Sequence, residues 1–350
     1  EMILDLSMIH SFGNYDNLPL FITASCEFSR YDDPEFVSAG EYVYLNEHGG
    51  GIALLTTTRL AYAHANLVVN RRIYENMDKE INGKLPRLGD LVRLSKIPSD
   101  NNYLNFVLLG DPALKLAYPQ YEVRTTEINA NLTDNIADTI RGLQEVTVIG
   151  EITSNDGALL TGFNGIVYPK VYDKPSNYST LGNDRGSYPE EFQLTDKLLF
   201  DGRASVKNGE FSFSFIVPKD IALEYGFGKI SYYALDTTHM IDAWGAYEKL
   251  VVGGVDSTTP PDNTGPTINI YLEDKTFISG DATSSKPLLL ADISDDQGIS
   301  YTGLSLGRDI VMVIDQDYAN SMIMNDYFEI DTDSYKGGSI AHQLSSLNSG

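Results

Sequence analysis

The pattern of apolar residues changes at Pro119, and this change limits the folds that are open to the chain. Before Pro119, continuous apolar runs alternate with segments whose apolar residues recur at helical spacing. After it, short segments of alternating apolar and polar residues are separated by Gly, Asn, Asp and Pro. The first pattern is typical of an α/β domain, and the second is typical of β-sandwiches.

The pattern of residues 1–118 therefore predicts a mostly parallel sheet with helices on its faces. Continuous apolar runs predict buried strands at 18–25, 52–57 and 106–109. Helical spacing predicts helices at 38–45, 60–77 and 88–94.

Two β-sandwich domains of the Ig-like kind are predicted after this, at 119–255 and 256–350. Their period-two strands include 145–152, 209–217, 229–234, 267–272, 288–293 and 310–314. Residues 165–190 are rich in Tyr, Asn, Asp and Ser and predict a long surface loop. Residues 251–266 contain Thr259-Pro-Pro261 and predict a linker. The last segment has fewer strands than a sandwich needs, so we expect it to be truncated.

Composition excludes two classes of partner. The formal net charge of −24 repels nucleic acid and anionic lipid. No apolar run is long enough to cross a bilayer. The first residues lack the basic region of a signal peptide, so we expect a mature chain or a piece of a longer one.

The chain has one cysteine, Cys26, which directly follows the first predicted strand. Sites in open parallel sheets lie beyond the carboxyl ends of strands, where a following helix can lower the pKa of a thiol. The second strand ends in Thr56-Thr-Thr-Arg59, so Thr57, Thr58 and Arg59 are predicted to share this rim with Cys26 and Glu27. The alternative interpretation is a cysteine packed under a loop.

A nucleophilic thiol needs a base, and each histidine is interpreted first as a surface or packing residue. The histidines are His10, His48, His64, His239 and His342. No pair has the spacing of a zinc site. The acidic segment 292–296 could offer oxygen ligands to calcium, although a solvated turn is the preferred interpretation. No cofactor is required.

Several long blocks resemble the gingipain-type cysteine peptidases, and more narrowly the PorU-type sortases of the type IX secretion system of Bacteroidetes. The blocks are Thr23-Ala-Ser-Cys-Glu-Phe28 within residues 17–34, residues 38–41, residues 50–60 and Leu108-Leu-Gly-Asp-Pro112 within residues 105–114. Phe215-Ile-Val-Pro-Lys-Asp-Ile221 and Asp295-Asp-Gln-Gly-Ile299 resemble the β-domains that follow that peptidase domain.

The resemblance implies a caspase-like α/β fold with a Cys–His dyad in which Cys26 is the nucleophile and its N–H contributes to the oxyanion hole. It implies an exported enzyme at the extracellular face of the outer membrane that works with other type IX components. Its substrates would be proteins with a C-terminal secretion signal, which it removes before transferring the cargo to a lipopolysaccharide anchor.

One departure from the family pattern is important. The family's catalytic His precedes the Cys in a Gly-His-Gly turn, and residues 1–26 contain no such turn. We therefore expect the base to lie upstream of Glu1 and the chain alone to be inactive. Two alternatives stay open: a non-catalytic surface scaffold or binding module built on a degenerate peptidase domain, and a hydrolase that uses His48 or His64 as its base.

Overall fold

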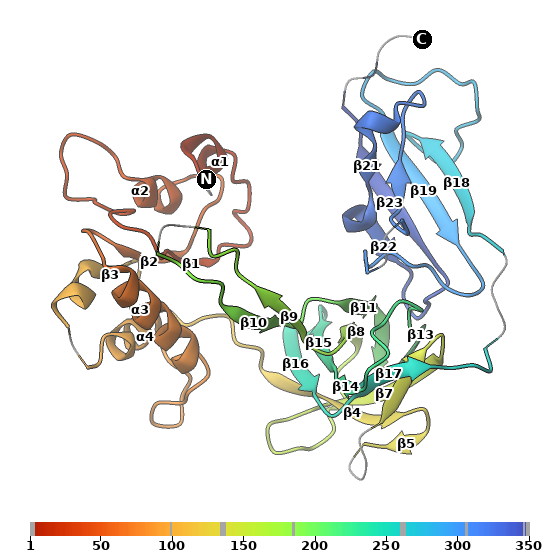
Figure 1. The fold of residues 1–350 in the computed structure, drawn as a ribbon, viewed down its shortest axis with the longest axis horizontal. Helices are drawn as coiled ribbons and strands as arrows, with labels where there is room; N and C mark the ends of the chain where they lie inside the picture. The colour runs from red at the N-terminus through yellow and green to blue at the C-terminus, as the bar shows by residue number, and fades with distance from the viewer. Residues whose placement is uncertain are drawn as a thin grey trace. The chain divides into compact units, whose positions relative to one another are not determined.

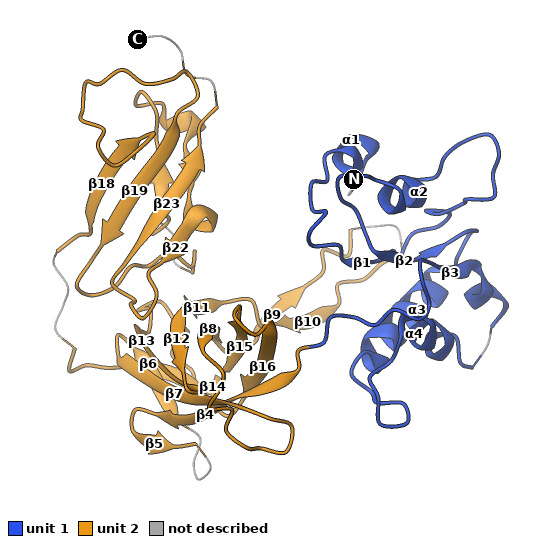
Figure 2. Ribbon diagram, turned by 180° about the vertical axis from the view of Figure 1, so that it is seen from behind, with its two compact units in different colours: residues 1–118 blue, residues 119–350 orange. Residues whose placement is uncertain are grey.

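The computed structural model describes residues 4–98, 100–133, 138–183, 186–259, 264–304, 307–345 and 347. The chain forms two compact units, residues 1–118 and residues 119–350 (Figure 2). The described residues include no helix that is both long and apolar enough to span a bilayer. The predicted separation of residues 119–255 from 256–350 stays a prediction.

Unit 1 contains a three-stranded sheet with β2 at its centre (Figure 1). Its strands are β1 (Leu20–Ile22), β2 (Ala53–Thr57) and β3 (Phe106–Leu109). Its helices are α1 (Leu6–His10), α2 (Ala39–Tyr44), α3 (Ala63–Asn76), α4 (Leu88–Ser95) and the 3₁₀-helix η1 (Asn101–Asn105). The helices and strands predicted here all exist, although β1 is shorter than its apolar run and only half-buried.

The predicted mostly parallel sheet is wrong for this unit, because β1 and β2 are parallel whereas β2 and β3 are antiparallel. One helix between two strands returns the chain to the end where the first strand began, which gives a parallel pair. Two long helices separate β2 from β3. The second helix carries the chain back to the end of β2, so that Phe106 pairs with Thr57.

The core of unit 1 forms on both faces of β2, whose five residues are all buried. Leu54 packs with Ile9 of α1 and Val43 of α2. Leu55 belongs to the cluster with α3, and Ala53 belongs to the cluster with α4. Successive side chains of a strand point to opposite faces, so helices on both faces cover β2 completely.

Unit 2 begins with a sheet that closes on itself. Its strands are β4 (Tyr121–Ile128), β5 (Asn131–Leu132), β7 (Glu145–Thr153), β8 (Gly165–Tyr172), β11 (Leu198–Asp201), β12 (Ala204–Lys207), β13 (Glu210–Ile216), β15 (Lys229–Asp236) and β16 (Ile241–Tyr247). The order runs β8-β12-β13-β7-β4-β16-β15, and β15 pairs again with β8. A smaller sheet joins β14 (Gly226–Phe227), β17 (Val251–Val255) and β6 (Thr139–Gly142).

The closed order differs from the predicted pair of sandwich sheets. Each strand of the ring finds a partner on both edges, so closure removes the open edges that two separate sheets would keep. The interior holds the alternate residues of β13, namely Phe211, Phe213 and Phe215, and Phe213 lies in stacked contact with Phe200. The alternation was predicted correctly, but it does not determine how the sheet closes.

The surface loop predicted at 165–190 is also wrong, because its first part is the strand β8 at the junction of the ring. The loop was predicted from the Tyr, Asn, Asp and Ser content of the whole segment, and the strand also contains Pro169, a residue that is rare within sheets. Pro169 lies in the gap where one neighbour of β8 changes from β12 to β11. The rest includes the exposed ribbon of β9 (Ser176–Ser179) and β10 (Glu191–Leu194).

The last part of unit 2 is a four-stranded antiparallel sheet in the order β18-β19-β23-β22. Its strands are β18 (Thr267–Leu272), β19 (Leu288–Ser294), β22 (Phe328–Ile330) and β23 (Gly337–Gln343), and a short ribbon joins β20 (Val311–Met312) to β21 (Met322–Ile323). Two single turns of 3₁₀-helix complete it, η2 (Tyr318–Asn320) and η3 (Asn325–Tyr327). Of the predicted linker, 251–255 forms β17, and 260–263 lie outside the described residues.

The turn between β15 and β16 depends on the buried carboxylate of Asp236. It accepts hydrogen bonds from the backbone N–H groups of Thr238, His239 and Asn164, at 2.9, 3.1 and 3.1 Å. The ring of His239 lies 2.8 Å from the same carboxylate. The hydrogen bond from His239 and then that from Asn164 hold the pKa of Asp236 well below its ordinary value.

We predict that Asp236→Asn lowers the melting temperature by several degrees at neutral pH, because an amide cannot satisfy all these donors. A carboxyl whose pKa falls on folding stabilises the protein above its unfolded pKa, and this stabilisation is lost as the pH falls towards the folded pKa. The difference between the two proteins should therefore shrink in acid. Thermal melting across pH measures it, with the exposed Glu248→Gln as control. An equal melting temperature at neutral pH would contradict this role.

Candidate functional site

Cys26 lies beyond the carboxyl end of β1, and its side chain is exposed. Its Sγ accepts a hydrogen bond from the Ala61 N–H at 3.3 Å and lies 3.2 Å from the Ala61 carbonyl, to which it donates. The next helix in sequence after the thiol is α2, which begins only at Ala39, close to the start predicted for it at 38. The helix whose start lies beside the thiol is α3, which begins two residues after Ala61.

The backbone turns sharply at the residue after the thiol. Glu27 has a φ of 54°, in the left-handed region that few residues other than glycine adopt. This conformation costs about 1–2 kcal/mol. Backbone strain of this kind is concentrated at functional sites, where the surrounding structure enforces it.

The loop around Cys26 is held by the hydroxyl-rich end of β2. The Thr57 hydroxyl donates to the Ser25 carbonyl, and the Thr57 carbonyl accepts from the Ser29 N–H at 3.0 Å. The hydroxyls of Ser29 and Thr23 each lie 2.9 Å from the Thr56 hydroxyl. We call Thr56 and Thr57 the threonine clamp. Both residues are fully buried, so the clamp positions the loop from beneath.

A glycine allows α2 to pack directly against this loop. The Gly40 N–H donates to the Phe28 carbonyl at 2.8 Å. A Cβ at Gly40 would lie 1.7 Å from the Ser29 hydroxyl oxygen, which is an impossible contact. The loop that carries the thiol is thus fixed by β2 on one side and by α2 on the other.

Charged side chains form the rim of the site. Arg59 binds both carboxylate oxygens of Asp32, at 2.9 and 2.6 Å. The hydrogen bond between them lowers the pKa of Asp32 and raises the pKa of Arg59. Arg30 lies 3.5 Å from Glu27 and 3.4 Å from Asp33. The structure therefore brings the predicted residues Glu27 and Arg59 to one exposed rim, where each is paired with a neighbour.

The two predicted threonines differ in environment. Thr57 belongs to the buried clamp, whereas Thr58 is partly exposed. The Thr58 N–H and hydroxyl both donate to the Asn105 carbonyl, at 2.9 and 3.3 Å. Contact of either threonine with a substrate stays a prediction. Because Thr57 is buried, it is less suited to such a contact than Thr58. Sequence reasoning missed Ala61, because a backbone contact leaves no signal in residue type.

None of the five histidines, all of which lie within the described residues, makes a hydrogen bond to Cys26. The His10 ring packs against Tyr42 with centroids 5.2 Å apart, and the His342 ring packs against Tyr327 at 4.2 Å. His239 belongs to the turn that contains Asp236. His48 and His64 have exposed side chains in a turn and on α3.

The described residues include no group of His, Cys, Asp and Glu side chains that could hold a metal ion. In the predicted calcium segment, Asp292 forms an ion pair with Lys275 at 2.8 Å. The Asp295 carboxylate accepts from the Gln297 N–H at 2.8 Å, as in a solvated turn.

The chain is similar to several solved structures. It is 28% identical to dimeric latent PorU from Porphyromonas gingivalis, over 85% of this chain and 29% of that chain, with a TM-score of 0.47. The Arg-specific cysteine proteinase gingipain R is 12% identical, over 70% of this chain and 48% of that one, with a TM-score of 0.30. The chain thus spans less than a third of the length of the PorU chain. No curated protein sequence matched it.

A family model matches the first part of the chain. Residues 1–117 match the model of peptidase family C25, and this range contains the sheet, the threonine clamp and Cys26. The match confirms the predicted resemblance to gingipain-type peptidases. Residues 1–117, about a third of the chain, are thus similar to peptidase family C25.

Proposed function

We propose that Cys26 is the nucleophile of a cysteine endopeptidase that can also act as a transpeptidase. The observation that carries this proposal is an exposed thiol beyond the carboxyl end of β1, held by the backbone of Ala61 in a C25 segment. The strained Glu27 and the threonine clamp support it, because a nucleophile must be presented in one fixed direction.

The chemistry follows from the thiol. The thiolate attacks the scissile carbonyl carbon, the C–N bond breaks, and the amine leaves with a proton from the general acid, forming a thioester. The Cys26 N–H would stabilise the oxyanion of the intermediate. Water then releases a free carboxylate, or an amine takes the acyl group and completes a transfer. The same thioester therefore serves hydrolysis and transpeptidation.

The base is the missing component. Among the described residues no imidazole makes a hydrogen bond to Cys26, and these residues include His48 and His64. We infer that the base is supplied from outside residues 1–350, as the family resemblance implies. The rival interpretation is a non-catalytic surface scaffold. In that case no histidine outside residues 1–350 would act as a base for Cys26.

The substrates we propose are exported proteins with a C-terminal secretion signal, at the extracellular face of the outer membrane. This part rests on the resemblance of residues 17–34 and 105–114 to PorU-type sortases. Glu27, Thr58 and Arg59 are the proposed substrate contacts. The Arg59–Asp32 pair would have to open, or bind as a pair, when a substrate occupies the rim.

We predict that residues 1–350 do not cleave a protein that carries a type IX C-terminal signal, because the dyad acts as a unit. A chain extended upstream along its own reading frame should cleave it, and Cys26→Ala in that chain should reduce the rate about 10³-fold or more. Mass spectrometry of the products measures both. Turnover by residues 1–350 that is lost in Cys26→Ala would refute the missing base, and an extended chain that stays active as Cys26→Ala would refute the nucleophile.

We predict that Thr57→Val alters the presentation of the thiol. It removes the donor to the Ser25 carbonyl, which should lower the free energy of unfolding by about 0.5–1.5 kcal/mol. Because Cys26 is the one cysteine of the chain, its rate of alkylation by iodoacetamide is a single-site measurement. That rate should change in Thr57→Val and stay the same in the control Thr58→Val. An unchanged rate and an unchanged stability would show that the clamp does not hold the loop.

A further inference from the structure

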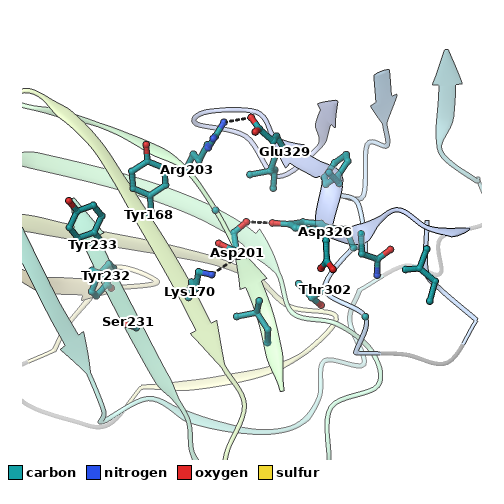
Figure 3. A pocket seen from close by; sticks show the side chains of 18 residues that line it. Tyr168, Lys170, Asp201, Arg203, Ser231, Tyr232, Tyr233, Thr302, Asp326 and Glu329 are labelled. Atoms are coloured by element: carbon teal, nitrogen blue, oxygen red, sulfur yellow. Dashed lines mark hydrogen bonds and ion pairs between the residues drawn. The ribbon is translucent and has the colours of Figure 1, made fainter. Parts of the chain in front are cut away.

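A cavity of about 820 Å³ lies within unit 2 (Figure 3). One wall consists of the outward face of β8 and β15 in the closed sheet, and the other consists of residues 301–303 and 323–330 of the last part of the chain. The two walls are joined by the Tyr301 hydroxyl, which donates to the Asp201 carbonyl, and by an ion pair of 3.0 Å between Arg203 and Glu329. The cavity is far from the chemistry of Cys26 in sequence and belongs to the other unit.

Three aromatic side chains stand in a row beside this cavity. In the register of the sheet, Tyr233 of β15 pairs with Tyr168 of β8 on one side and with Trp244 of β16 on the other. Residues directly opposite one another across strands project from the same face of a sheet. The rings of Tyr168 and Tyr233 are stacked, with centroids 6.4 Å apart and an angle of 27° between their planes.

This aromatic row is exposed. Tyr233 is 42% exposed and Trp244 is 57% exposed, although Trp is usually well buried in folded proteins. The Arg203 guanidinium lies 5.9 Å from the centre of the Tyr168 ring, and the Tyr233 hydroxyl lies 3.5 Å from the Asp242 carboxylate. The row is therefore a partly exposed aromatic platform whose three strands are fixed in register by their pairing.

Polar groups stand next to the platform on the same face. Lys170 and Ser231 pair with each other in the register, two residues along from the two tyrosines. Lys170 forms an ion pair of 3.0 Å with Asp201. Thr302 and Asp326 face this group from the other wall (Figure 3). Hydrogen-bond donors and acceptors thus border the stacking surface.

We propose that Tyr168, Tyr233 and Trp244 bind a neutral oligosaccharide whose hydroxyl groups reach Lys170, Asp201 and Ser231. A sugar ring combines an apolar C–H face, which stacks on aromatic rings, with a border of hydroxyl groups that both donate and accept. Lys170 and Arg203 are each engaged with a carboxylate, and the chain carries a net charge of −24. Among the described residues that line the cavity, a phosphorylated or carboxylated glycan would find no unpaired cation, so charge favours a neutral one.

A proline-rich peptide is another ligand that binds on aromatic surfaces. Its prolines carry carbonyl acceptors but no N–H donors, so it would match fewer of the donors and acceptors of the border than a saccharide does. A peptide of this kind is therefore an outcome that the test must separate from a saccharide.

The test uses the single tryptophan of the chain as its reporter, since all Trp emission comes from Trp244. An array of neutral and anionic glycans is first probed with residues 1–350. The protein is then titrated with maltohexaose, cellohexaose, mannohexaose and each neutral glycan that binds on the array, while Trp244 emission is recorded. We expect saturable binding of a neutral glycan with a shift of Trp244 emission. Tyr233→Ala should weaken the affinity about tenfold, which corresponds to one lost ring contact.

Two variants control for indirect effects. Tyr233→Phe keeps the ring and should keep the affinity. Tyr178→Ala removes another stacked tyrosine, the partner of Phe192 on the β9–β10 ribbon, and should change nothing. Cys26→Ala should bind equally well, so failure of the peptidase proposal leaves this result intact.

Three outcomes would overturn the proposal. In the first, the folded chain binds no neutral glycan on the array. In the second, it binds one, but Tyr233→Ala does not weaken the affinity. In the third, it binds anionic glycans or a polyproline peptide in place of neutral glycans.

Discussion

The packing of β2 between two layers of helices is the constraint on which unit 1 depends. Because all five residues of β2 are buried, the strand cannot shift its register without moving its apolar side chains to the wrong layers. That rigidity passes to its carboxyl end, where the hydroxyls of Thr56 and Thr57 replace apolar contacts with directed hydrogen bonds. The position of the Cys26 thiol thus depends on β2, although the Cys26 side chain itself forms its hydrogen bonds with the Ala61 backbone.

A comparable constraint operates in unit 2 through β8. This strand pairs with β15 along one edge and with β12 and then β11 along the other, so it closes the sheet. Closure turns one set of its side chains inward and fixes the other set in register on the outer face. Tyr168 stands beside Tyr233 for that reason, and the aromatic row follows from strand pairing.

Sequence reasoning was most accurate where local physics decides the structure. Apolar runs and helical spacing located β2, β3, α3 and α4 to within a few residues. It failed at strand direction and at closure, because these depend on which distant segments meet. The strand at Gly165–Tyr172 was missed because the segment 165–190 as a whole is rich in Tyr, Asn, Asp and Ser. Only the change of neighbour from β12 to β11 shows how the sheet accommodates Pro169.

The sequence by itself determined that an α/β segment with a lone thiol after a strand precedes a β-rich region, and several of its blocks resemble those of gingipain-type peptidases. Only the tertiary structure decided what surrounds that thiol. The Ala61 backbone, the clamp beneath Ser25 and the absence of an imidazole partner among the described residues all join positions that lie far apart in the chain. Contacts of this kind depend on backbone geometry and packing, which leave no pattern in the local order of residue types.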